Sequence, residues 1–288
     1  MKFVISGAFQ PPQDLIPIAL AAEEFGFDAL SFSDHVVYPE TLDTPYPYTA
    51  DGSRRYDETT EFPDPWVVTG ALSSVTTRLR FTTNVFVLPM RNPFLAAKQI
   101  ATAAAMSKGR VTLTIGVGWS NIEFELVGQS FARRGARADE MLLVMQKLWS
   151  GETIDHEGEF YHFDRLKLTP PLPPSPIPIW VGGISDRALR RAARNEGWLS
   201  DLQTSSEILE CVDRVRSYRR ELGRGESFDV MASANDAMDV DGYRRLGEGG
   251  VTHVLTMPWV FYHGLTEDVG KKVDGIKRFA EDVIAKMI

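Results

Sequence analysis

The stretch LRFTTNVFVLPMRNPFLAAKQIATAAAMSKGRVTLTIG, residues 79–116, decides the fold class. Its two ends, 79–88 and 110–116, are rich in β-branched and aromatic residues, which predicts two strands. The segment between them, 93–107, begins with a proline and predicts a helix. A strand, a helix and a second strand in this order predict that the two strands pair in parallel.

The same alternation extends over the whole chain. Further strands are expected at 3–9, 28–33, 178–182, 197–201, 228–234 and 251–257, and further helices at 14–26, 65–77, 136–150, 185–195, 206–222, 240–247 and 266–287. Residues 151–177 break the rhythm with a small hairpin and a proline-rich crossing. Eight strand–helix units predict a (β/α)8 TIM barrel, α/β in class, as one domain over 1–288 with an insertion between the fourth helix and the fifth strand. An open doubly wound sheet is the alternative, but the first strand leads into AFQPPQD and not into a glycine-rich nucleotide turn.

Composition excludes several classes of protein. The formal net charge of −8 argues against nucleic acid or an anionic membrane as a partner, because both require clustered lysine and arginine. The single cysteine, Cys211, leaves no intrachain disulfide. The amino terminus lacks the features of a secretory signal, and no apolar run approaches the roughly 20 residues of a membrane span. We therefore expect a soluble, cytoplasmic protein.

In a TIM barrel, the carboxyl ends of the strands and the loops that follow them build the active site. Asp34 and His35 end the second expected strand, and imidazole is the usual general acid or base near neutral pH. The alternative is that Asp34 caps a turn and His35 is structural. Thr83, Asn84 and Val85 lie at the end of the third strand, where they form either a polar edge of the site or an ordinary β-prone run.

Glycines follow two later strands. Gly116 and Gly118 precede Trp119; they lack the third glycine of a dinucleotide loop, and we expect them to let the backbone approach a ring that Trp119 flanks. Gly182 and Gly183 lead to Ser185 at the start of a helix, which predicts an anion site, a simple N-cap, or both. No metal site is predicted, because His156, His162 and His253 have no carboxylate at zinc-ligand spacing.

Taken in order, these segments resemble the bacterial luciferase-like superfamily of flavin and deazaflavin oxidoreductases, and most of all its coenzyme F420-dependent branch. The resemblance covers nearly the whole chain and rests on SDH (33–35), LRFTTNVFVLPMRNP (79–93), GRVTLTIGVGW (109–119), FARRGARADE (131–140), IPIWVGG (177–183) and NEGWLSD (195–201).

The resemblance implies a role for most of these residues. It implies a cis peptide bond at Asn84-Val85 that backs the cofactor ring, Asp34 and His35 beside that ring, and phosphate contacts from Gly182 and Gly183. It also implies coenzyme F420 as cofactor, with FMN as the alternative, and a homodimer formed through the helices that follow the early strands.

One departure from the family concerns the substrate. Trp119 stands where the sugar-phosphate dehydrogenase of the superfamily has an acidic residue, and basic residues for a phosphate are not evident. We therefore expect a more apolar substrate, lined by aromatic side chains: Phe9, Tyr46, Tyr48, Tyr56, Trp119 and Trp259. The leading hypothesis is hydride transfer between F420 and an organic substrate. The alternatives are an FMN-dependent monooxygenase and a non-catalytic flavin- or deazaflavin-binding protein.

Overall fold

Nine parallel strands form one sheet in the order β3-β2-β1-β11-β10-β9-β8-β5-β4, in a computed structural model that describes residues 1–287. Their bounds are β1 Lys2–Ser6, β2 Ala29–Phe32, β3 Arg80–Thr83, β4 Phe86–Val87, β5 Leu113–Gly116, β8 Ile179–Gly182, β9 Gly197–Leu199, β10 Asp229–Ala232 and β11 His253–Thr256. Two bonds join the edge strand β3 to the residues that lead into β5: the Phe81 amide donates to the Arg110 carbonyl at 2.8 Å, and the Thr112 amide donates to the Phe81 carbonyl at 2.9 Å. The sheet thus closes into the expected barrel.

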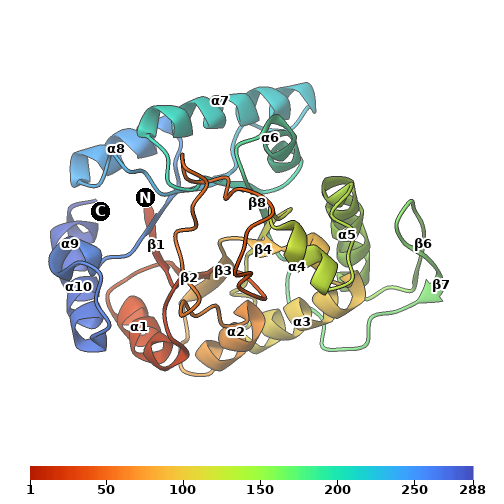
Figure 1. Ribbon diagram of the computed structural model, residues 1–288, viewed down its shortest axis with the longest axis horizontal. Helices are drawn as coiled ribbons and strands as arrows, with labels where there is room; N and C mark the ends of the chain where they lie inside the picture. Colours follow the sequence, from red (N-terminus) through yellow and green to blue (C-terminus); the bar gives the residue numbers. More distant parts are fainter. Residues whose placement is uncertain (288) are drawn as a thin grey trace.

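The helices surround the strands (Figure 1). They are α1 Pro12–Glu24, α2 Pro65–Ser73, α3 Pro93–Met106, α4 Asn121–Leu126, α5 Arg134–Trp149, α6 Asp186–Ala193, α7 Ser205–Glu221, α8 Val240–Gly249, α9 Val260–His263 and α10 Val269–Asp282. The first and last long helices pack together, and the buried Lys272 donates to Asp14 at 2.6 Å across that contact. No helix within residues 1–287 is long and apolar enough to cross a membrane.

The third expected strand, 79–88, is not continuous. It is divided into β3 and β4, and the peptide bond Asn84-Val85 between them is cis, as the resemblance implies. The first half, β3, pairs with β2, and the second half, β4, pairs with β5. The divided strand therefore connects β2 to β5 within the barrel. The count of nine strands against the expected eight has this single cause.

Alternation along the strands separates two apolar layers. The outward-facing residues and the helices form the main core, whereas a smaller cluster fills the barrel interior: Val4, Ala29, Trp180, Leu199, Met231 and Leu255. The side chain of Val85 packs against this inner cluster. The segment Asn84-Val85 between β3 and β4, which we call the bulge, therefore contacts the interior of the barrel.

Two segments lie outside the regular alternation. The antiparallel strands β6 Ile154–Glu157 and β7 His162–Leu166 form the hairpin in 151–177, which projects beyond α5 in Figure 1. The connection between β2 and α2, residues 36–64, contains no helix or strand, and we call it the strap. In Figure 1 the strap, in orange, crosses the middle of the ring of helices.

Candidate active site

Three strand ends converge on the side chain of Val85. A Cβ placed on Gly116, at the end of β5, would lie 2.3 Å from Val85 Cγ2. A Cβ on Gly182, at the end of β8, would lie 2.4 Å from Val85 Cγ1. Both distances are far below van der Waals contact, so only glycine fits at these two positions. The bulge and the two glycines, which the sequence placed in separate motifs, thus form one surface at the carboxyl end of the barrel.

His35 forms a dyad with Glu123. The His35 Nδ1 atom lies 2.9 Å from Glu123 Oε2, and the Val36 amide donates to Glu123 Oε1 at 2.8 Å. Burial alone would raise the pKa of Glu123, but hydrogen bonds from His35 and from the backbone hold it below its ordinary value. Glu123 is therefore a carboxylate that fixes the orientation of the imidazole. The Nε2 atom of the same ring makes no hydrogen bond within residues 1–287, which leaves it available to a ligand.

Glu123 is a site residue that the sequence did not single out. It lies on α4, a helix of 6 residues that was not predicted because it is too short to show a periodic apolar pattern. A signal existed in Ser120-x-x-Glu123, the pattern of a capping box. Ser120 caps the helix at 3.5 Å from the Glu123 amide, but the Glu123 side chain turns to His35 and does not complete the box.

Asp34 holds the strand that follows the bulge, β4, through a hydrogen bond from its backbone. It is buried, accepts from the Val87 amide at 2.8 Å and pairs with Arg91 at 2.6 Å. Burial raises the pKa of Asp34, and the Arg91 guanidinium and the Val87 amide oppose that effect. Neighbouring Ser33 donates to the Asn84 carbonyl at 3.3 Å. Asp34 thus holds the β3–β4 segment in place, next to His35 in the chain.

Aromatic rings of the strap cover His35. The ring centroids of Tyr56 and Phe62 lie 4.9 Å and 5.0 Å from the imidazole centroid, and Trp119 lies 6.1 Å away on the opposite connection. Tyr46 touches Trp119 at 5.2 Å between centroids, and burial together with nearby Asp201 raises its pKa to about 12. The predicted aromatic wall therefore forms, and Phe62, which follows no strand and carries no motif, is an additional member.

Of the remaining aromatic residues predicted to line the site, two join the wall and one does not. Tyr48 contacts Tyr46 at 5.2 Å, and Phe9, at the end of β1, contacts Phe62 at 5.6 Å, so both join the wall. Trp259 does not join it. Its side chain is 1% exposed, and its backbone packs so closely on α10 that a Cβ on Gly275 would lie 2.3 Å from Trp259 Cα.

Two further predicted residues have structural contacts. The Thr83 hydroxyl donates to the Thr114 carbonyl at 2.7 Å and is fully buried, so it links β3 to β5. Gly118 has a φ of +77°, and a Cβ there would lie 2.6 Å from Val87 Cγ1, so this position also requires glycine.

The start of α6 is arranged as an N-cap. Ser185 Oγ accepts from the Ala188 amide at 3.3 Å, and Gly183, with a φ of +113°, precedes it. Two arginines of α6 are engaged within the protein: Arg190 pairs with Asp186 at 2.9 Å and Arg191 with Asp139 at 2.5 Å, whereas Arg187, in the first turn, is exposed. An anionic group at this end of β8 would therefore contact backbone amides and not these guanidinium groups.

Buried polar atoms without partners mark where a bound ring fits. Gln10 Oε1, after β1, and Ser31 Oγ, in β2, are both buried and lack a hydrogen-bond partner within the described residues. Unpaired buried groups are costly unless a ligand or water satisfies them. Gln10 and Ser31 lie near the carboxyl ends of β1 and β2, at the end of the barrel that carries Gly116, Val85 and Gly182, so they suit the polar edge of a flavin or deazaflavin.

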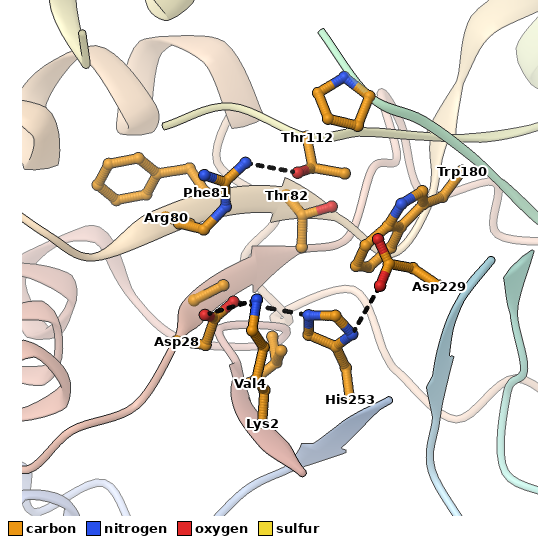
Figure 2. A pocket seen from close by; sticks show the side chains of 12 residues that line it. Lys2, Val4, Asp28, Arg80, Phe81, Thr82, Thr112, Trp180, Asp229 and His253 are labelled. Carbon is orange, nitrogen blue, oxygen red and sulfur yellow. Dashed lines mark hydrogen bonds and ion pairs between the residues drawn. The ribbon is translucent and has the colours of Figure 1, made fainter. Parts of the chain in front are cut away.

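A separate cavity of about 110 Å³ lies at the other end of the barrel, at the amino ends of the strands. Figure 2 shows Lys2, Asp28, Asp229 and His253 around it, with Trp180 as a wall. The buried His253 lies 3.7 Å from Asp28 and 3.9 Å from Asp229, and desolvation lowers its pKa to about 4 despite these carboxylates. In TIM barrels this end contributes to stability, and none of the predicted site residues lies here. Among the described residues, no cluster of potential metal ligands is present at either end.

The chain is similar in sequence to a known family and to several proteins of other organisms. The family model described as luciferase-like monooxygenase matches residues 3–241. An uncharacterized protein of Mycobacterium tuberculosis strain H37Rv is 39% identical over 290 residues, covering 100% of both chains. The F420-dependent glucose-6-phosphate dehydrogenase of Nakamurella multipartita is 29% identical over 245 residues, covering 82% of this chain and 66% of that protein.

Solved structures share the architecture. The monooxygenase RslO1 from Streptomyces bottropensis superimposes with a TM-score of 0.78 at 17% identity, over 100% of both chains. An F420-dependent secondary alcohol dehydrogenase in complex with an F420-acetone adduct gives a TM-score of 0.77 at 17% identity, over 100% of this chain and 99% of that one. At this level of identity, the likeness shows the fold.

The barrel, its carboxyl-end site and the family match define an enzyme of the oxidoreductase type expected from the sequence. The chain belongs to the luciferase-like monooxygenase family. Its curated relatives and structural neighbours include both F420-dependent oxidoreductases and monooxygenases, which supports a flavin or deazaflavin as cofactor.

Proposed function

We propose that this chain transfers a hydride between coenzyme F420 and a small organic substrate. The observation that carries the proposal is the His35–Glu123 dyad, at the carboxyl end of the barrel that also presents Val85, Gly116 and Gly182. The relatives named for F420-dependent dehydrogenation support the cofactor.

In this proposal the ring of the cofactor lies on the surface of Val85 and the two glycines. Asn84 and the carbonyls of the bulge border the ring, and the backbone of Gly183 and Ser185 receives its phosphate. Gly118 and Trp119 flank the ring on the strap side. The deazaflavin, when bound, supplies the hydride, and the protein supplies orientation and proton transfer.

His35 is the proposed acid–base residue. Glu123 occupies Nδ1, so the proton that the substrate gains or loses is carried at Nε2. Asp34 holds the bulge and sets the position of the adjacent His35. The strap excludes water from this region, which strengthens polar interactions inside it. Phe9, Tyr46, Tyr48, Tyr56 and Trp119 form the proposed substrate wall.

A second function has support from a different observation, since the neighbours include a monooxygenase. In that case FMN replaces F420 and the reduced enzyme consumes oxygen. Titration of the purified protein with each cofactor, followed by absorbance and fluorescence, distinguishes the two. We expect saturable F420 binding and no oxygen uptake by the reduced complex; tight FMN binding without an F420 response contradicts the proposal.

We also propose a homodimer formed through α2 and α3. Val67 on α2 is 72% exposed and Leu95 on α3 is 66% exposed, and the two helices pack side by side. Light scattering after size exclusion tests this: a dimer is expected, and a Val67→Glu, Leu95→Glu double variant should elute as a monomer.

A further inference from the structure

We propose that the substrate is an electrically neutral, flat carbonyl or conjugated compound, held between the cofactor and the rings of the strap. This inference rests on the proposed function and adds the chemical class of the substrate. Three features of the carboxyl end of the barrel, which we call the mouth, support this proposal. They are its aromatic walls, the contacts of its cations, and the contacts of its carboxylates.

The walls are aromatic on two sides of His35. Tyr56 and Phe62 come from the strap, and Trp119 comes from the connection after β5. These rings contact one another as well as His35, with 5.0 Å between the centroids of Tyr56 and Phe62. A planar apolar molecule matches such walls, because flat rings pack face-on or edge-on at these separations.

Few cations occur on the connections that leave the carboxyl ends of the strands. In residues 7–11, 183–185, 200–204, 233–239 and 257–268 there is no lysine or arginine. The strap contains two arginines, and the connections after β4 and β5 contain Arg91 and Arg133, with Arg134 starting α5. Beside His35, an anionic substrate would have to be held by one of these five groups. A sixth, Arg187, is exposed in the first turn of α6 and follows the Gly183–Ser185 backbone proposed for the cofactor phosphate.

Both arginines of the strap are engaged. Arg54 lies 3.6 Å from the centroid of the Tyr38 ring and donates to the Pro39 carbonyl at 2.5 Å. Arg55 pairs with Asp201, beyond β9, at 2.8 Å and donates to the Tyr48 carbonyl at 2.6 Å.

The other three are engaged as well. Arg91 pairs with Asp34, Arg133 with Glu159, and Arg134 donates to the Gly118 carbonyl at 2.9 Å. A carboxylate or phosphate beside His35 would therefore lose its hydration without gaining a free cation, which is unfavourable.

Several carboxylates around the mouth are engaged too, which disfavours a cationic substrate, whereas Glu40, Glu58 and Glu61 of the strap are exposed to solvent. Glu123 binds His35, and Asp201 binds Arg55. On the strap, Asp57 accepts from the Thr59 hydroxyl at 2.7 Å, and Asp64 caps α2 through the Trp66 amide at 2.9 Å. Aromatic rings can attract a cation by themselves, so a cationic probe belongs in the test.

The experiment measures binding by calorimetry, with three ketones that share one shape. They are 4-isopropylacetophenone, which is neutral, 4-acetylbenzoate, which is anionic, and 4-acetyl-N,N,N-trimethylanilinium, which is cationic. The protein is first loaded with F420, whose own fluorescence reports occupancy. We expect the neutral ketone to bind at least ten times more tightly than either charged one.

Two variants and one control accompany the ligands. Phe62→Ala should weaken neutral binding about tenfold, whereas Phe163→Ala, on the hairpin, should leave it unchanged. Phe62→Lys places an unpaired cation at the wall and should shift the preference toward the anion. Equal or tighter binding of a charged ketone by the wild-type protein, or no ketone binding to the F420-loaded protein, overturns the inference while the proposed cofactor use stands. Failure of F420 to bind overturns the proposed function itself.

Discussion

His35 and Glu123 lie 88 positions apart in the chain, yet His35 Nδ1 and Glu123 Oε2 are 2.9 Å apart. One residue follows β2 and the other lies on α4 after β5, and the barrel brings them together at the carboxyl ends of its strands. Because Glu123 occupies Nδ1, only Nε2 can face a substrate. The dyad is therefore a directional acid–base group.

The first prediction concerns this dyad. Glu123→Gln keeps the size of the side chain but removes the carboxylate that orients the imidazole. We expect turnover to fall about 10- to 100-fold, because the acid–base group loses the partner that fixes its direction. Glu125→Gln on the same helix, where the side chain accepts from Asn121 at 2.7 Å, is the matched control. Unchanged turnover in Glu123→Gln would show that the dyad has no part in acid–base catalysis.

The second prediction concerns the glycines around Val85. Gly182→Ala places a methyl group 2.4 Å from Val85 Cγ1 and should destabilise the fold by about 1–3 kcal/mol through overpacking. F420 affinity should fall with it, because the bulge must shift. In urea unfolding, the Gly182→Ala, Val85→Ala double variant should recover part of the loss. Gly225→Ala, where nothing lies within 4 Å of the added Cβ, should change stability by less than about 0.5 kcal/mol.

The third prediction is a pH dependence that arises at the other end of the barrel. Burial lowers the pKa of His253 from 6.5 to about 4, so the unfolded chain binds more protons than the folded chain between these values. Stability should therefore be complete above about pH 6.5 and fall as the pH drops toward 4, by at most about 3 kcal/mol. His253→Gln should flatten this slope in urea unfolding measured at several pH values. A slope that persists in the variant would assign the effect to other groups.

The fourth prediction concerns the contact between the first and last long helices. Lys272 and Asp14 are buried and 2.6 Å apart, so Lys272→Met leaves a buried carboxylate without its partner. The expected cost is about 3–5 kcal/mol, and the Asp14→Leu, Lys272→Met double variant should recover most of it. Arg216→Met, which breaks an exposed pair with Asp213, should cost about 0.5 kcal/mol. Equal effects of Lys272→Met and Arg216→Met in thermal unfolding would contradict this account.

The barrel could be predicted from the sequence because each strand and helix carries its own local pattern. The strand at 79–88 shows the limit of that approach: its composition is continuous, but the bulge at Asn84-Val85 packs against Gly116 and Gly182, which lie far along the chain. Only the family resemblance indicated it.

Some residues of the site could likewise be predicted from the sequence, and others could not. His35 and the glycines were found because they follow strands, and strand ends meet at one mouth. Glu123 was missed because α4 is short and its role depends on a residue from another connection. Trp259 was assigned to the mouth by the same rule, but the chain turns at Pro258 and carries it under α10. Position along the chain predicts the end of the barrel on which a residue lies, and packing decides the direction of its side chain.

A structure of the protein with bound F420 would locate the cofactor ring. We expect the deazaflavin ring to lie against Val85, with Gly116 and Gly182 beneath it and His35 Nε2 directed toward the substrate side of the ring. A ring bound elsewhere, for example in the cavity between Trp180 and His253 at the amino ends of the strands, would contradict this expectation.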